Sequence, residues 1–143
     1  MNLLKSILAA ALLIPCFAFP ADVNWDVYLG DKASTHFSSL KQITPRNVTK
    51  LQVAWTYRAG GTDPNNRSQI QCNPLVIDGV LYGTSPDLQL FALAADSGRE
   101  LWRFNPASIR GLTRAGVNRG LVYWADRQDR RILFGCDRFL HAV

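Results

Sequence analysis

The segment of residues 91–104 constrains most strongly what this chain can fold into. An apolar run over 91–95 is followed by Asp96-Ser97-Gly98 and by a second run over 99–104, which contains Trp102. The aspartate supplies a side-chain acceptor for its own backbone, and the glycine adopts a positive φ at no steric cost. The segment therefore predicts two antiparallel strands joined by a tight turn, with Trp102 able to pack flat across a neighbouring sheet.

The strands around this turn are echoed later in the chain. Residues 80–84 (VLYGT) resemble residues 132–136 (ILFGC), and residues 90–93 (LFAL) resemble residues 140–143 (LHAV). The copies are about fifty residues apart, a period that suits one blade of a β-propeller. An unrelated run of β-hairpins is the alternative, but repeat, turn and tryptophan agree on the propeller.

Two further hairpin signals accompany the copies. Asp78-Gly79 stands between apolar runs at the start of the first copy and predicts a two-residue hairpin turn. The second copy has a longer, charged hairpin over residues 125–130. We therefore expect an all-β chain.

The turn, the tryptophan and the repeat together resemble the tryptophan-docking motif of the dehydrogenases that depend on pyrroloquinoline quinone (PQQ). These quinoproteins, which include glucose, polyol and alcohol dehydrogenases, fold as propellers of eight four-stranded blades. The resemblance implies that this chain is a fragment of such an eight-bladed β-propeller. It implies a first blade over about residues 70–105 and a partial second blade over about residues 117–143.

Residues 22–58 resemble the leading segment of the same family. Three stretches, 25–31, 35–40 and 42–48, follow the family's order, so the resemblance covers nearly all of the chain from Trp25 onwards. In the family, the strand at the end of this segment completes the last blade, whose other strands are not in this sequence.

Local signals within the leading segment predict one helix and one strand. Thr44 and Pro45 are a helix cap and a first-turn proline, so they predict a short helix that ends near Leu51. Apolar and polar residues alternate over 52–58, which predicts a strand.

The last residue, Val143, falls inside the strand that should precede a second turn and tryptophan. A closed propeller needs about 4–8 blades, so we expect this chain to be the amino-terminal fragment of a longer enzyme. Burial in a propeller comes from blade packed on blade, and the fragment alone is therefore expected to be poorly stable and inactive.

Residues 1–18 are predicted to be a secretory signal peptide. Lys5 gives a positive start, residues 7–14 an apolar core, and Cys16-Phe17-Ala18 a cleavage pattern of small residues. A membrane anchor is the alternative, but the apolar run is shorter than the ~20 residues of a spanning helix. A lipoprotein signal would need a small residue in place of Pro15. We therefore expect residues 19–143 to be exported to the periplasm.

The net charge of +5 does not predict nucleic-acid binding. The arginines behind it are scattered among strands and hairpins and form no compact basic run. A solvated blade surface accounts for most of them.

The cysteines bear on the subgroup of the family. Cys72 and Cys136 remain after export, and an oxidising compartment makes their pairing possible. Many alcohol-oxidising quinoproteins carry two adjacent cysteines near the cofactor, where alignment on Asn118-Arg119-Gly120 gives this chain Thr113 and Arg114. This departure favours the sugar- and polyol-oxidising side of the family over methanol and ethanol dehydrogenases.

The first candidate site residue lies just before the first strand of the first blade. In many relatives a glutamate three residues before the proline that matches Pro74 contacts the quinone, and here that position is Gln71. An amide still donates and accepts hydrogen bonds, so the resemblance implies cofactor binding by Gln71 without the negative charge. An ordinary polar loop over residues 68–74 is the alternative.

The second candidate site lies in residues 116–124 (GVNRGLVYW), which closely resemble the family's Asn-Arg-Gly-(Leu/Val)-x-Tyr-Trp segment. The arginine of that segment binds the reactive carbonyl oxygens of the quinone, so the resemblance implies that Arg119, with its neighbour Asn118, binds PQQ. Hydride transfer to a carbonyl carbon drives negative charge onto its oxygen, and a fixed guanidinium stabilises that charge. A structural arginine that binds backbone carbonyls is the alternative. Tyr123 and Trp124 are expected to pack within the blade.

No metal site is predicted from the residues present. His36 and His141 lie in separate segments without paired ligand spacing. The family's calcium acts as a Lewis acid on the quinone, and an aspartate takes the proton of the substrate hydroxyl. The calcium ligands and this catalytic base are expected beyond Val143.

The sequence thus predicts part of a periplasmic PQQ-dependent dehydrogenase. By resemblance, the parent enzyme oxidises a sugar, polyol or alcohol by hydride transfer. It is expected to pass electrons to a cytochrome or ubiquinone acceptor, and peripheral membrane association is compatible with this role. The alternative is a non-enzymatic propeller with the same repeats, a scaffold in outer-membrane protein assembly. Arg119 favours the enzyme, because a scaffold has no need of a quinone-facing arginine.

Overall fold

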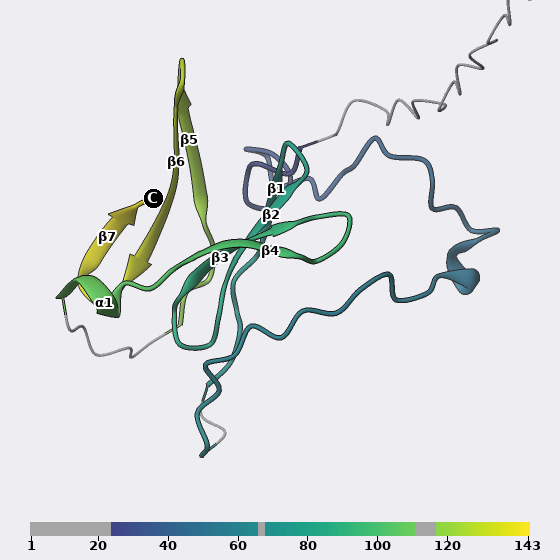
Figure 1. Cartoon of the computed structure of the whole chain (residues 1–143). Helices are drawn as coiled ribbons and strands as arrows, with labels where there is room; N and C mark the ends of the chain where they lie inside the picture. Colours follow the sequence, from purple (N-terminus) through teal and green to yellow (C-terminus); the bar gives the residue numbers. More distant parts are fainter. Residues whose placement is uncertain (1–23, 66–67, 111–116) are drawn as a thin grey trace, which may run out of the picture.

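A computed structural model describes residues 24–65, 68–110 and 117–143, and within them the chain forms two antiparallel sheets (Figure 1). The first sheet has the order β1-β2-β3-β4 and the second the order β5-β6-β7, so each strand pairs with the next one along the chain. The strands are β1 (Leu75–Ile77), β2 (Val80–Thr84), β3 (Leu90–Ala94), β4 (Glu100–Phe104), β5 (Val122–Asp126), β6 (Asp129–Cys136) and β7 (Phe139–Ala142). Two short helices, η1 (Val48–Lys50) and α1 (Ala107–Arg110), complete the described elements. The predicted signal peptide, Thr113 and Arg114 lie outside the described residues.

The predicted repeat corresponds to matching strands. Residues 80–84 form β2 and residues 132–136 end β6, while residues 90–93 lie in β3 and residues 140–142 in β7. Each echo therefore falls on equivalent strands of two successive meanders, the chain path of successive propeller blades.

The hairpin turns follow from residues that tolerate positive φ. Asp78 (φ +49°) and Gly79 (φ +75°) join β1 to β2, and positive φ at both central residues is the requirement of a type I′ turn. The longer, charged hairpin that the sequence predicts forms between β5 and β6, and its length lies in the strands and not in the turn. Asp126 pairs with Asp129, so the two strands are long and only two residues, with Arg127 at φ +54°, form the turn.

The Asp96-Ser97-Gly98 turn is confirmed between β3 and β4. The Ala94 carbonyl accepts hydrogen bonds from the N–H groups of Ser97 (3.3 Å) and Gly98 (2.8 Å), and Gly98 has φ +68°. The tryptophan packed on this turn is Trp55, from the leading segment. The sequence allows Trp102 to pack flat across a neighbouring sheet, and its ring is tilted by 54° to that of Tyr82. The Trp102 ring lies 5.9 Å from that of Tyr82 on its own sheet, and 38% of the residue stays exposed.

The segment of residues 52–58 is not a strand, although its alternation is real. Trp55 and Tyr57 are half-buried and their neighbours exposed, but the segment joins neither of the two described sheets. Its side chains contact the first sheet instead: the rings of Tyr57 and Phe91 lie 5.0 Å apart, and the Trp55 Nε1 donates to the Ala95 carbonyl at 3.1 Å. By family resemblance, the strands that would pair with this segment are not in this sequence, and its described contacts to the first sheet are made by Trp55 and Tyr57.

The predicted helix is shorter than expected. It ends where predicted, but η1 begins only at Val48, because Asn47 holds the preceding residues in a turn. The Asn47 Oδ1 accepts a hydrogen bond from the Thr44 N–H (2.6 Å), and its Nδ2 donates to the Gln42 carbonyl (2.7 Å). Residues 31–50 loop away from both sheets and are almost all exposed (Figure 1). Neither helix of the described ranges is long and apolar enough to cross a bilayer.

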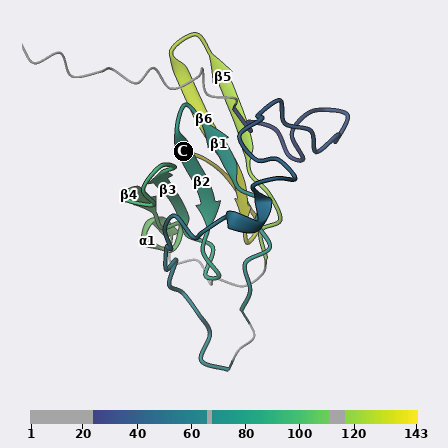
Figure 2. The ribbon, with the colours of Figure 1, turned by 90° about the vertical axis from the view of Figure 1, so that its right-hand side faces the viewer.

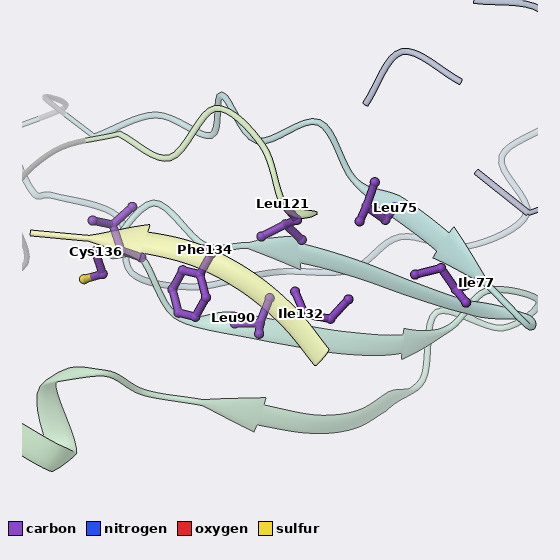
Figure 3. Packing of buried hydrophobic residues seen from close by; sticks show 8 residues of the cluster. Leu75, Ile77, Leu90, Leu121, Ile132, Phe134 and Cys136 are labelled. Atoms are coloured by element: carbon purple, nitrogen blue, oxygen red, sulfur yellow. The ribbon is translucent and has the colours of Figure 1, made fainter. Parts of the chain in front are cut away.

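The two sheets pack against each other through one apolar core. Figure 2 shows the β5–β6 hairpin running alongside the first sheet and past its end, and Figure 3 shows the buried side chains between β6 and β1–β3. The members, each at most 4% exposed, are Leu75, Ile77, Leu88, Leu90, Leu121, Ile132, Phe134 and Cys136. This shared core fixes the start of β1 relative to the start of β5, where the candidate site residues lie.

Candidate functional site

The structure brings the two predicted site segments together. Asn73, two residues after Gln71, forms an isolated parallel bridge with Gly120, the residue after Arg119. The Arg119 carbonyl oxygen accepts a hydrogen bond from the Asn73 backbone N–H and another from its Nδ2, both at 3.2 Å. Each segment directly precedes the first strand of its sheet, so the candidate site lies where two successive sheets begin.

Asn118 shapes the turn that carries Arg119. The residue is only 9% exposed. Its Oδ1 accepts a hydrogen bond from the Gly120 N–H (3.1 Å), and its Nδ2 donates to the Gly135 carbonyl in β6 (3.3 Å). Its amide is thus engaged with the backbone of its own turn and of the neighbouring strand.

The Arg119 side chain is exposed, and its guanidinium has no hydrogen-bond or ion-pair partner among the described residues. Its five N–H donors therefore remain available, in a planar fork that matches carboxylate and carbonyl oxygens. This donor set fits an anionic quinone cofactor such as PQQ. A purely structural arginine would instead be bound to carbonyls of its own chain.

Gln71 is half-buried on the neighbouring segment, and its side-chain amide makes no hydrogen bond within the described residues. It therefore keeps both its donors and its acceptor for a ligand. The next residue, Cys72, offers less chemistry, because burial raises the pKa of its thiol and keeps it protonated. Cys72 and Cys136 both remain thiols, so the disulfide that the sequence left open is not formed.

The structure adds one aromatic residue to this region. An isolated bridge between Trp25 and Val76 holds the leading segment on the edge of β1. It brings Tyr28 to Gly120, where a β-carbon would lie 3.6 Å from the tyrosine ring. Sequence reasoning recognised the order of residues 25–31 but gave Tyr28 no role, because a long-range contact of this kind leaves no local signal.

Two hollows of the described structure lie away from Arg119. One of about 280 Å³ opens between the sheets and is lined by Tyr82, Trp102, Tyr123 and Arg130 among others. The other, of about 320 Å³, is mainly apolar and lies between the first sheet and Trp55. Neither is lined by Gln71, Asn118 or Arg119, but the second is lined by Ile70, Cys72 and Pro74, which flank Gln71 in the sequence.

The described residues contain no group of three or more His, Cys, Asp or Glu side chains that could hold a metal ion. His36 is exposed in the leading segment. His141 stacks on Phe134, with ring centroids 5.2 Å apart, and packs against Phe104 at 5.7 Å.

Comparison with known proteins assigns the chain to a family. Residues 25–143 match the PQQ family model, which is described as "Glucose/ethanol/alcohol dehydrogenase, beta-propeller domain". The chain is 37% identical to quinate/shikimate dehydrogenase (quinone) of Acinetobacter baylyi over 119 residues, which are 81% of this chain and 14% of that protein. It is 35% identical to 1-butanol dehydrogenase (cytochrome c) of Thauera butanivorans over 117 residues, 79% of this chain and 16% of the relative. It is 37% identical to quinoprotein glucose dehydrogenase of Escherichia coli over 89 residues, 60% of this chain and 11% of the relative.

The chain thus spans only 11–16% of the length of these three relatives. The match nevertheless includes both sheets, the Asp-Ser-Gly turn and the Asn118-Arg119-Gly120 turn. Repeat, strand order and profile agree on a propeller. The chain therefore belongs to the PQQ-dependent glucose, ethanol and alcohol dehydrogenase family, of whose β-propeller domain it is a part.

Proposed function

We propose that the protein carrying this chain is a PQQ-dependent dehydrogenase that oxidises a sugar, polyol or alcohol. The observation that carries the proposal is the state of Arg119. Its guanidinium is exposed and has no partner within the part of the chain that the structure describes, while its peptide is bound on both sides by asparagines. The names of the relatives support a hydroxyl-bearing substrate, since they include a quinate/shikimate, a 1-butanol and a glucose dehydrogenase.

When bound, PQQ would supply the acceptor for the hydride, and with it the electron pair, that the substrate gives up. The role we assign to Arg119 is to stabilise the negative charge that develops on the acceptor oxygen, which a fixed guanidinium does without reorganising at the moment of reaction. Gln71 would orient the same group through neutral hydrogen bonds. Direct contact between Asn118 and PQQ stays a prediction, since its amide already binds Gly120 and Gly135.

The remaining parts of the proposal rest on the family resemblance and on the leader sequence. By family resemblance, calcium would be held by residues beyond Val143. We propose a cytochrome or ubiquinone as electron acceptor, and one relative is named as linked to cytochrome c. Residues 1–18 support export to the periplasm.

The test is a two-step assay of the full-length protein. The apoprotein is titrated with PQQ in the presence of calcium, and the loaded protein is then mixed with glucose, quinate, glycerol and 1-butanol while the quinone absorbance is followed. Saturable PQQ binding and reduction by at least one of the four compounds are expected. A folded protein that binds no PQQ would refute the proposal and favour the scaffold in outer-membrane protein assembly.

A further inference from the structure

The peptide unit between Arg119 and Gly120 is bound at both of its polar atoms. Its carbonyl oxygen accepts the two hydrogen bonds from Asn73, each 3.2 Å long. Its N–H donates to the Asn118 Oδ1 at 3.1 Å. Because a peptide is planar, holding its oxygen and its N–H holds the orientation of the whole unit and restrains the ψ angle of Arg119.

The two asparagines belong to different parts of the fold. Asn118 lies on the same turn as Arg119 and is anchored to β6 through the Gly135 carbonyl. Asn73 lies 46 residues before Arg119, directly ahead of β1 in the other sheet. The backbone of Arg119 is therefore tied to both sheets, whereas its side chain is left exposed and without a partner among the described residues.

We propose that Asn73 is a positioning residue for Arg119: by holding the Arg119 carbonyl with two donors, it pre-orients the guanidinium for the cofactor. This inference rests on the proposed function. The expected gain in affinity is entropic. An arginine on a mobile turn would lose backbone as well as side-chain freedom on binding, whereas a peptide that is already held has lost its backbone freedom before the ligand binds.

The test is a double-mutant cycle on PQQ affinity, measured by titrating the full-length apoprotein and following its fluorescence. Asn73→Ala should weaken PQQ binding about twofold to tenfold, the effect of one neutral hydrogen bond. In an Arg119→Ala background, Asn73→Ala should cause no further loss, because its effect passes through Arg119. Asn24→Ala is the matched control, since Asn24 also binds a distant residue, Asp78, through two hydrogen bonds of 2.9 and 3.3 Å.

The outcomes separate this inference from the function on which it rests. Equal losses from Asn73→Ala in both backgrounds, or a loss matched by Asn24→Ala, would make Asn73 merely structural and overturn the inference. Unchanged PQQ affinity in Arg119→Ala alone would refute the site assignment itself. Should Asn73→Ala fail to fold, Asn73→Asp keeps the shape of the side chain but removes its donor, and wild-type affinity in that variant would equally overturn the inference.

Discussion

The indole ring of Trp55 lies directly against Gly98, the glycine of the turn between β3 and β4. A β-carbon on Gly98 would come within 2.4 Å of the Trp55 Cε3 atom. The Trp55 Nε1 also donates a 3.1 Å hydrogen bond to the Ala95 carbonyl of the same turn. One tryptophan and one glycine thus dock the leading segment on the first sheet.

Gly98→Ala should destabilise the protein by about 2–4 kcal/mol. A positive φ costs a residue with a β-carbon roughly 1 kcal/mol, and an overpacked contact adds about 1–3 kcal/mol. Urea unfolding of the full-length protein measures the loss. Gly135→Ala is the matched control, because a β-carbon there would meet no atom within 4 Å, and it should change stability by less than about 1 kcal/mol. Equal stability of the two variants would contradict the docking of Trp55 on Gly98.

The loss of folding stability at acidic pH should depend on Glu100. Hydrogen bonds from Arg103, the larger cause, and from Tyr57 hold the pKa of this carboxyl below its ordinary value of 4.5. The folded state then binds the proton less readily than the unfolded state. The contribution of ionised Glu100 to the stability of the fold is therefore fully present above pH 4.5 and is lost as the pH falls through the lowered pKa.

Glu100→Gln should therefore lose less stability than the wild type when the pH is lowered from 7 to 3. The difference should be small, since 38% of the Glu100 side chain is exposed and water screens the ion pair. Urea midpoints at the two pH values check it. The same loss in both proteins would show that Glu100 carries no part of the acid sensitivity.

Cys72 should react slowly with alkylating reagents. Burial raises the pKa of its thiol, and the thiolate is the reactive form, so alkylation by iodoacetamide at pH 8 should be slower in the folded protein than in urea. Peptide mapping by mass spectrometry gives the rate for each thiol. Cys136, only 2% exposed, serves as the internal reference for a core thiol. Labelling of Cys72 at its unfolded rate would contradict the described burial.

The local parts of the fold could be predicted from sequence, whereas the contacts between distant segments could not. Asp78-Gly79 and Asp96-Ser97-Gly98 specify turns by the φ angles that they tolerate, and both form as predicted. The alternation over 52–58 correctly predicts that Trp55 and Tyr57 face the protein. The segment joins neither described sheet, and the strands that the family resemblance pairs with it are not in this sequence.

In the candidate site, too, the contacts between distant segments could not be predicted from sequence. Arg119 and Gln71 could be proposed because the family motif names their positions, and the bridge between Asn73 and Gly120 brings their segments together. The part played by Asn73 was missed, since a side-chain bond to a carbonyl 46 residues away leaves no pattern in sequence. Tyr28 was missed for the same reason.

Gln71→Ala should weaken PQQ binding only mildly, by about 0.5–1.5 kcal/mol, because it removes a neutral hydrogen bond. Titration of the full-length apoprotein with PQQ measures this. Gln69→Ala, two residues earlier on an exposed position of the same loop, is the control and should bind as the wild type does. A larger loss for Gln69→Ala than for Gln71→Ala would place the cofactor elsewhere on this loop.

The role proposed for Arg119 is to stabilise charge on the bound quinone, and stopped-flow reduction by substrate at saturating PQQ and calcium measures it. Arg119→Ala should slow the reduction, because it raises the activation free energy by about 2–4 kcal/mol. This is the typical cost of one lost donor to a developing oxyanion. Arg127→Ala, which removes an equally exposed arginine at the turn between β5 and β6, should leave the rate unchanged. If the Arg119→Ala protein reduces its quinone at the wild-type rate, Arg119 has no part in the chemistry, and the proposed stabilisation of charge by its guanidinium is wrong.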